Sequence, residues 1–252
     1  MTHTNKPDSN ELDEKFTAFM QHVRIVPASE CALILYIDQP LSDKLGVALT
    51  RISKQVEVLA GNINLEIIAS YASLLISYLP LETDHFARKN LLLNAIKTML
   101  NSSDPLQQHQ NSTLVELPVF YSKQTGPDLE RIAHHHKLST DAVIKLHQQE
   151  VYRVFAIGFA PGFAYLGQVS EQIAMPRLAT PRNWVPKGAV AIADRQTAVY
   201  PAASPGGWNI IGQCPMLMFD PKRNPSMPFS VGDTVRFKAV DKDRYLALGG
   251  EL

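Results

Sequence analysis

The sequence has few cysteines, no net charge and no long apolar run, and each shortage excludes a class of protein. Cys31 and Cys214 are too few for a disulfide-stabilised scaffold, so we expect reduced thiols and a cytoplasmic protein. A formal net charge of zero gives no field that would attract nucleic acid or an anionic membrane surface. The polar N-terminus lacks the apolar core of a signal peptide, and runs such as 31–37 are too short to span a membrane.

Common catalytic motifs are missing as well. The chain has no GxxxxGK[ST] phosphate loop, no GxGxxG, no GxSxG and no HExxH. The consecutive histidines His134, His135 and His136 do not replace a metal motif. Adjacent side chains on a helix point about 100° apart, so three in a row do not converge on one ion. We therefore predict no metal site and no self-contained nucleotide site.

The first half of the chain alternates strand and helix patterns. Residues 1–20 are polar, and we expect a disordered tail there. Beyond the tail, apolar periodicity and capping signals predict the order βαββαβ over 21–120. The expected strands lie near 31–37, 65–69, 73–78 and 113–120, with one helix after Ser42 and another around Leu92 to Leu100. This order is the split βαβ of a ferredoxin-like domain, with both helices on one face of an antiparallel sheet.

Residues 121–150 are interpreted as a helical connector. Pro127 suits the first position of a helix, and Ser139 the N-cap of a second one. The pair resembles a helix-turn-helix, but its second helix offers little beyond Lys145 and His147 to a base edge, so we expect no DNA binding. His147 is a lone histidine near the end of that helix. It is a candidate for proton transfer, and a packing role is the alternative.

Residues 151–245 differ from the rest in their density of turn residues. The stretch from Gly158 to Gly232 holds ten of the 17 prolines and eight of the 13 glycines, interleaved with aliphatic and aromatic residues. Proline fixes φ and glycine permits positive φ, so this spacing predicts sharp turns between short strands. The expected strands lie near 154–157, 189–193, 197–200, 209–212, 216–219 and 234–239. A closed or sandwiched β domain follows from this pattern.

The same stretch carries six lysines or arginines against three acids, which favours the binding of a small anion among its turns. Arg177 and Arg182 each follow a proline, whose fixed φ lowers the cost of ordering the arginine. Because arginine binds carboxylate or phosphate in bidentate fashion, we predict that both bind the anion. The further candidates are neutral donors and aromatic walls, for each of which a structural role is the alternative. They are Tyr165, Gln196, Tyr200, Ser204 and Trp208.

Several strings, in their order and spacing, resemble the family of 5-oxoprolinase B subunits. That family also includes KipI, a sporulation-kinase inhibitor, and the allophanate hydrolase subunit 1 domain of urea amidolyases. The strings are GFAPGFAYLG, PRLATPR, QTAVYP, SPGGWNIIG and MFDP, preceded by YASLLISYLP, GPDLE and LSTDAVIKLH. The resemblance covers roughly residues 23–238. It implies an N-terminal α/β domain joined to a C-terminal cyclophilin-like β-barrel over 151–245.

The resemblance also implies one component of a complex rather than a lone enzyme. The B subunit acts with the A and C subunits to open 5-oxoproline, a small anionic amide, to glutamate with hydrolysis of ATP, for which Mg²⁺ is the counter-ion. The residues expected to take part in the chemistry are His147, Gln196 and Ser204. Those expected to bind the substrate are Tyr165, Arg177, Arg182, Tyr200 and Trp208. A KipI-like inhibitor of a histidine kinase and an allophanate hydrolase-type component are the alternatives.

Overall fold

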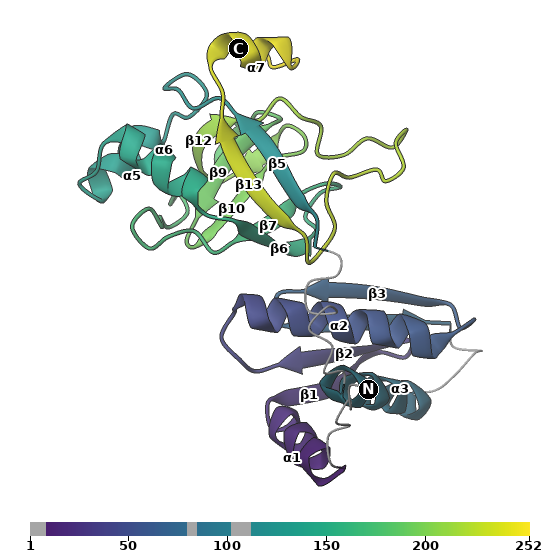
Figure 1. Ribbon diagram of the computed structural model, residues 1–252. Coiled ribbons are helices and arrows are strands. Elements are labelled where there is room, and N and C mark those ends of the chain that lie inside the picture. Colours follow the sequence, from purple (N-terminus) through teal and green to yellow (C-terminus); the bar gives the residue numbers. More distant parts are fainter. Residues whose placement is uncertain (1–8, 80–84, 102–111) are drawn as a thin grey trace, which may run out of the picture. The chain divides into compact units, whose positions relative to one another are not determined.

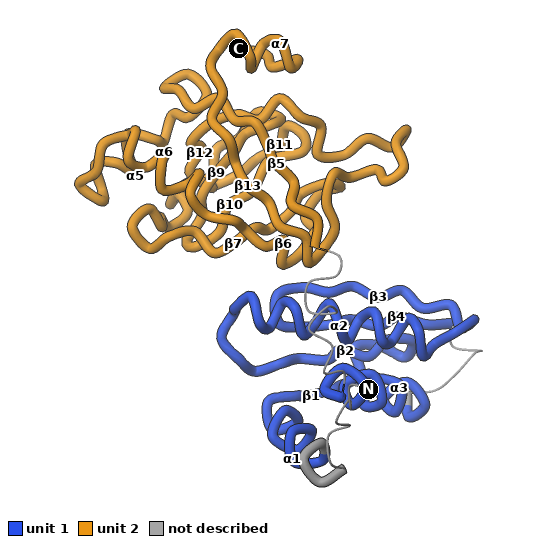
Figure 2. The backbone as a smooth tube through the Cα atoms, in the orientation of Figure 1, with its two compact units in different colours: residues 1–110 blue, residues 111–252 orange. Residues whose placement is uncertain are grey.

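The computed structural model describes residues 9–79, 85–101 and 112–252. The chain folds into two compact units, residues 1–110 and 111–252 (Figure 2). None of the helices in the described residues is long and apolar enough to cross a membrane.

The first unit is an antiparallel sheet with helices packed on one of its faces (Figure 1). Its elements are α1 (Ser9–Met20), β1 (Val23–Ser29), β2 (Ala32–Ile37), α2 (Asp43–Ala60), β3 (Leu65–Ser70), β4 (Ser73–Tyr78) and α3 (His85–Asn101). The strand order is β1-β2-β4-β3. Alternate residues of β2 and β4 are buried against α2 and α3, because successive side chains of a strand point to opposite faces.

Capping explains where α2 begins and ends. The Ser42 hydroxyl accepts a hydrogen bond from the Leu45 N–H at 3.3 Å, and the helix stops at Gly61, whose φ is 59°. Its buried residues Leu45, Leu49, Ile52 and Val56 recur at helical spacing and form the core with α3 and the sheet. The predicted helix after Ser42 is therefore confirmed.

Two expectations for the first unit are wrong. Residues 9–20 form a helix rather than a disordered tail, while residues 1–8 lie outside the described part. Phe16, Phe19 and Met20 stand at i, i+3 and i+4, and this stripe packs on the core of the unit.

The predicted βαββαβ order is also wrong. The sheet takes its fourth strand from β1, and the expected strand at 113–120 pairs within the second unit. β1 is an edge strand with Pro27 in it, a residue that weakens a strand pattern but is tolerated at a sheet edge. The unit therefore runs ββαββα after α1, and not as a split βαβ.

The second unit is built on a seven-stranded sheet that curls into a nearly closed barrel (Figure 1). The strand order is β12-β9-β10-β7-β6-β13-β5. These strands are β5 (Leu114–Val119), β6 (Tyr152–Ile157), β7 (Ala164–Gly167), β9 (Ala189–Ala193), β10 (Gln196–Val199), β12 (Asn209–Gln213) and β13 (Thr234–Ala239). The edge strands β5 and β12 meet at a bridge in which Phe120 and Gln213 exchange backbone hydrogen bonds of 2.9 and 3.0 Å.

Additional elements attach to this sheet. They are the helices α5 (Leu129–His135), α6 (Thr140–Gln149) and α7 (Lys242–Ala247), and a two-stranded ribbon of β8 (Arg182–Val185) and β11 (Ser204–Gly206). As expected, α6 is capped by Ser139, whose hydroxyl accepts from the Ala142 N–H at 3.1 Å. The expected strand at 216–219 is wrong: this segment lies between Pro215 and Pro221 and forms no ladder.

Both faces of the central strands are buried, by two different sets of side chains. One cluster draws apolar residues from all seven barrel strands and from α5 and α6. The opposite face of β9, β10 and β12 is small and apolar, and aromatic rings cover it. Its small residues are Ala189, Ala191, Ala193 and Ala198. Because alanine leaves space above the sheet, this face accepts large rings, and the candidate site lies among them.

Candidate functional site

The candidate site is built on a group of aromatic side chains around Phe163. The centroid of the Phe163 ring lies 4.9 Å from that of Tyr165, 5.3 Å from that of Tyr200 and 5.7 Å from that of Trp208. These distances are typical of edge-to-face contacts between aromatic rings. Phe163, Tyr200 and Trp208 are almost fully buried, and Tyr165 is half-buried. The predicted wall residues are therefore brought together, around a phenylalanine that the sequence interpretation did not include.

Two arginines border the aromatic group. The guanidinium of Arg177 lies 5.7 Å from the Trp208 ring centroid, within cation–π distance. Arg182, at the start of β8, donates from Nη1 to the Trp208 carbonyl at 3.5 Å. Arg177 is exposed, whereas the side chain of Arg182 is only 29% exposed because it is held by an acid. Arg177 forms no ion pair with any residue in the described part of the chain, so its guanidinium can bind an anion without breaking one.

The hydroxyl of Tyr200 lies close to both cations. Burial raises the pKa of the Tyr200 phenol, while a hydrogen bond with the Trp208 backbone and the charges of Arg177 and Arg182 lower it. Gly206 has no side chain for a steric reason, since a Cβ there would collide with this hydroxyl. Because burial raises its pKa, the Tyr200 phenol remains a neutral hydrogen-bonding group at ordinary pH.

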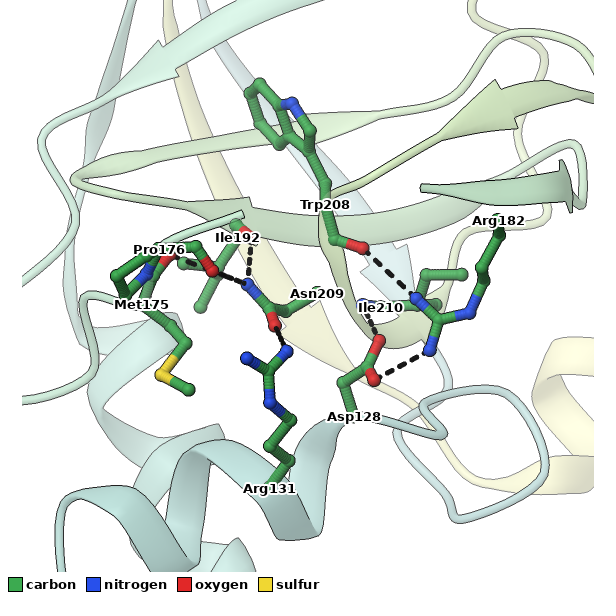
Figure 3. Close-up of polar contacts among 9 residues, drawn as sticks. All are labelled: Asp128, Arg131, Met175, Pro176, Arg182, Ile192, Trp208, Asn209 and Ile210. Atoms are coloured by element: carbon green, nitrogen blue, oxygen red, sulfur yellow. Dashed lines mark hydrogen bonds and ion pairs between the residues drawn. The ribbon is translucent and has the colours of Figure 1, made fainter. Parts of the chain in front are cut away.

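An acid that precedes α5 holds the second arginine in place (Figure 3). Asp128 is 5% exposed. Its Oδ1 accepts from Arg182 Nη2 at 2.7 Å, and its Oδ2 accepts from the Ile210 N–H at 2.7 Å. One carboxylate therefore connects α5, β8 and β12, and it fixes the backbone beside Trp208.

A buried amide makes a second connection of this kind (Figure 3). Asn209 is fully buried, and its Nδ2 donates to the carbonyls of Pro176 and Ile192, both at 3.0 Å. Its Oδ1 accepts from Arg131 Nη1 at 2.6 Å. These bonds hold the carbonyl of Pro176, the residue before Arg177, against β9 and β12. The arginine that borders the Trp208 ring thus projects from a fixed backbone.

Ser204 supplies an uncommitted hydroxyl close to the same face. It begins β11 and pairs with Val185 of β8, which belongs to the apolar cluster under the rings. Its Oγ is shielded from solvent and has no hydrogen-bond partner among the described residues. A shielded hydroxyl without a partner is unfavourable, and a ligand atom that reached this group would satisfy it.

The structure does not place His147 and Gln196 with the other candidates. His147 is fully buried in the barrel: its Nδ1 meets the Tyr121 hydroxyl at 2.8 Å and its Nε2 the Thr197 hydroxyl at 2.9 Å. Burial lowers the pKa of His147 to about 3. These contacts fit the packing role rather than proton transfer. Gln196 begins β10, about 13 Å along the strand from Tyr200 by the usual rise per residue.

Sequence reasoning missed Asp128, Arg131, Phe163 and Asn209. Asp128 stands in GPDLE and Asn209 in SPGGWNIIG. These strings identify the family resemblance, but they do not indicate what their polar residues bind. The Arg182–Asp128 and Arg131–Asn209 bonds join residues 54 and 78 positions apart, and local sequence patterns do not predict partners at such distances. Within the described ranges, no group of three His, Cys, Asp or Glu side chains is arranged to hold a metal ion.

Comparisons with known proteins agree with this architecture. The family model "Carboxyltransferase domain, subdomain C and D" matches residues 23–229. The chain belongs to this family. A 5-oxoprolinase B subunit from Escherichia coli O157:H7 is 35% identical over 228 residues, which cover 86% of this chain and 96% of the relative.

Two further relatives match over a smaller part of their length. A 5-oxoprolinase B subunit from Bacillus subtilis is 44% identical over 137 residues, which cover 54% of this chain and 57% of the relative. The solved structure of TTHA0988 superposes with a TM-score of 0.71 at 31% identity, over 83% of this chain and 40% of the other. The chain thus spans less than two thirds of these two proteins. TTHA0988 contains a large part that has no counterpart here.

Proposed function

We propose that the chain is the B subunit of an ATP-dependent 5-oxoprolinase. The observation that carries the proposal is the match to the E. coli B subunit over 96% of that protein. The named activity also fits the candidate site, because 5-oxoproline combines a carboxylate with a small hydrocarbon ring. Cationic and aromatic side chains are the groups that recognise these two features.

We propose that the second unit is a cyclophilin-like barrel whose outer face binds this substrate. Arg177 binds the carboxylate, since it is exposed and is positioned by cation–π contact with Trp208. Arg182 orients the neighbouring backbone through Asp128 and adds positive charge. The hydroxyls of Tyr200 and Ser204 are donors for the lactam oxygen or for a phosphate on it. Gln196 and His147 have no part in these contacts.

We propose that ATP, with Mg²⁺ as its counter-ion, is used by the assembled complex with the A and C subunits. An unstrained five-membered lactam resists water, so its carbonyl oxygen first takes the terminal phosphoryl group of ATP, and ADP leaves. Water then adds to the ring carbon, phosphate leaves, and the C–N bond breaks as the nitrogen takes up a proton, which yields glutamate. Cationic groups held in position stabilise the negative charge that develops in such a transfer. A cytoplasmic location stays a prediction from the sequence.

The test is reconstitution with the two partner proteins, measuring glutamate formed from 5-oxoproline and ATP with each component omitted in turn. Activity that requires this chain is the expected result. Activity without it, or failure of the three proteins to associate, would contradict the proposal. In the latter case, inhibition of a histidine kinase is the next assay.

Substitution of arginines in the second unit then tests the proposed substrate site. Arg177→Ala should raise the KM for 5-oxoproline at least about tenfold, because a hydrogen bond to a charged group contributes about 1.5–3 kcal/mol. Arg195→Ala is the matched control: this arginine lies in the same barrel but is paired with the exposed Glu171. Equal KM values for the two variants would exclude Arg177 from substrate binding.

A further inference from the structure

Phe159 combines two features that are each unfavourable for a phenylalanine. Its φ is 78°, in the left-handed region that bulky residues avoid, and its side chain is 68% exposed. Burial stabilises this side chain little, so it does not offset the cost of the strained backbone. Such a combination indicates a residue whose side chain contacts a molecule outside the folded chain. Phe159 stands in the string GFAPGFAYLG, but none of the contacts of the candidate site described above includes its ring.

The surrounding turn imposes this conformation. The Gly158 N–H donates to the Phe163 carbonyl, and the Phe163 N–H donates to the Ala160 carbonyl, both at 3.0 Å. Gly162 has a φ of 84° and lies so close to the Met218 carbonyl that any side chain there would collide with it. The turn is therefore anchored to itself and to the segment beneath it, and Phe159 is presented on a rigid support.

The Phe159 ring is also continuous with the candidate site. It meets the Phe163 ring edge-on, with centroids 5.3 Å apart and planes at 71°. Phe163 in turn contacts the rings of Tyr200 and Trp208, and Trp208 carries Arg177 over its face. The series thus runs from an exposed ring, through buried ones, to the cation assigned to the carboxylate.

We propose that Phe159 is a substrate-contact residue that covers the hydrocarbon face of the bound lactam while Arg177 binds its carboxylate. The proposal rests on the proposed function, since it concerns the substrate of that site. An aromatic ring packs well against methylene groups and keeps water from the reacting amide. Burial of Phe159 by the substrate would also remove the cost of exposing it.

The experiment uses the complete complex and compares Phe159→Ala and Phe159→Tyr with the wild type. For Phe159→Ala we expect the KM for 5-oxoproline to rise about tenfold with little change in kcat, since one large apolar contact is lost. Phe159→Tyr keeps the ring and should restore the wild-type KM. Trp184→Ala is the control, because Trp184 is 64% exposed on β8 and lies outside the ring series.

The outcomes separate the two proposals. A wild-type complex that forms no glutamate overturns the proposed function, and the role of Phe159 with it. An active wild type with an unchanged KM in Phe159→Ala overturns the role of Phe159 alone. A smaller assembled fraction for Phe159→Ala, with an unchanged KM in that fraction, also overturns it and assigns the ring to contact with a partner protein.

Discussion

The two units of this protein are stabilised in different ways. In the first unit, α2 and α3 cover one face of the sheet, and the core between them is apolar. In the second unit, the central strands are buried on both faces, and polar side chains are enclosed with them. Among the described residues, the only buried polar or charged side chain of the first unit is Arg88. Those of the second unit are Thr125, Asp128, His147, Thr197, Asn209 and Asp233.

This difference explains why most of the strings that resemble the family lie in the second unit. Apolar residues of similar size replace one another at moderate cost, so an apolar core leaves a sequence free to vary. A buried polar group requires one particular partner. Asp128, His147, Thr197 and Asn209 stand in GPDLE, LSTDAVIKLH, QTAVYP and SPGGWNIIG, respectively. Four of the strings that carry the family resemblance therefore contain residues that form the internal hydrogen bonds of the barrel.

The largest effect expected from this comparison is at Asn209. Asn209→Leu should lower the free energy of unfolding by about 4 kcal/mol, because the carbonyls of Pro176 and Ile192 and the guanidinium of Arg131 lose their partner at once. Both tryptophans, Trp184 and Trp208, lie in the second unit, so fluorescence during urea denaturation reports this unit alone. A loss below about 1 kcal/mol would mean that the buried bonds are not what stabilises the barrel.

A matched change in the first unit sharpens the contrast. Ile52 is fully buried in α2, and Ile52→Ala should cost about 3 kcal/mol through lost burial and the cavity that remains. Circular dichroism should detect the early unfolding of α2, while the tryptophan fluorescence transition stays in place. A fluorescence midpoint that shifts by the same amount would show that the units unfold together and would break the comparison.

The third prediction concerns pH. The folded pKa of His147 is about 3, below the ordinary value of 6.5, so the unfolded chain binds the proton more readily. The stability that the neutral imidazole contributes is fully present above pH 6.5 and is lost as the pH falls towards 3. The slope in this window approaches about 1.4 kcal/mol per pH unit.

His147→Gln tests this slope, because glutamine keeps hydrogen-bonding capacity but does not titrate. The difference in unfolding free energy between the wild type and this variant should shrink as the pH falls from 7.5 to 4.5. Fluorescence-monitored denaturation at a series of pH values measures it. A difference that does not depend on pH would place the imidazole in contact with water.

The smallest effect is expected on the surface of the barrel. Glu171 pairs with Arg195 at 3.0 Å, but its side chain is 80% exposed. Glu171→Ala should change stability by less than about 1 kcal/mol, since water and salt screen such a pair. The same denaturation experiment checks this value. A larger loss of stability would mean that surface ion pairs, and not only the buried hydrogen bonds, stabilise the second unit.

The sequence predicted local structure better than pairing. Ser42 and Gly61 mark the limits of α2, and the alternation in 73–78 matches β4, because caps and periodicity act over a few residues. The partner of β5 was misassigned, since a strand pattern does not name its neighbour. Arg177 and Trp208 were named as candidates from chemistry that is visible in the sequence, and their role in binding stays a prediction. Asp128 and Asn209 were not, because their roles depend on residues far along the chain.

The pairing of β5 with β13 has a consequence for how the protein is made. The two strands run parallel from Leu114 beside Thr234 to Val119 beside Ala239, although one opens the second unit and the other is its last strand. During synthesis, β5 leaves the ribosome long before its neighbour exists. All strand pairings of the first unit join residues between Val23 and Tyr78, so this unit is able to fold while the chain grows. The barrel closes only after translation has passed β13.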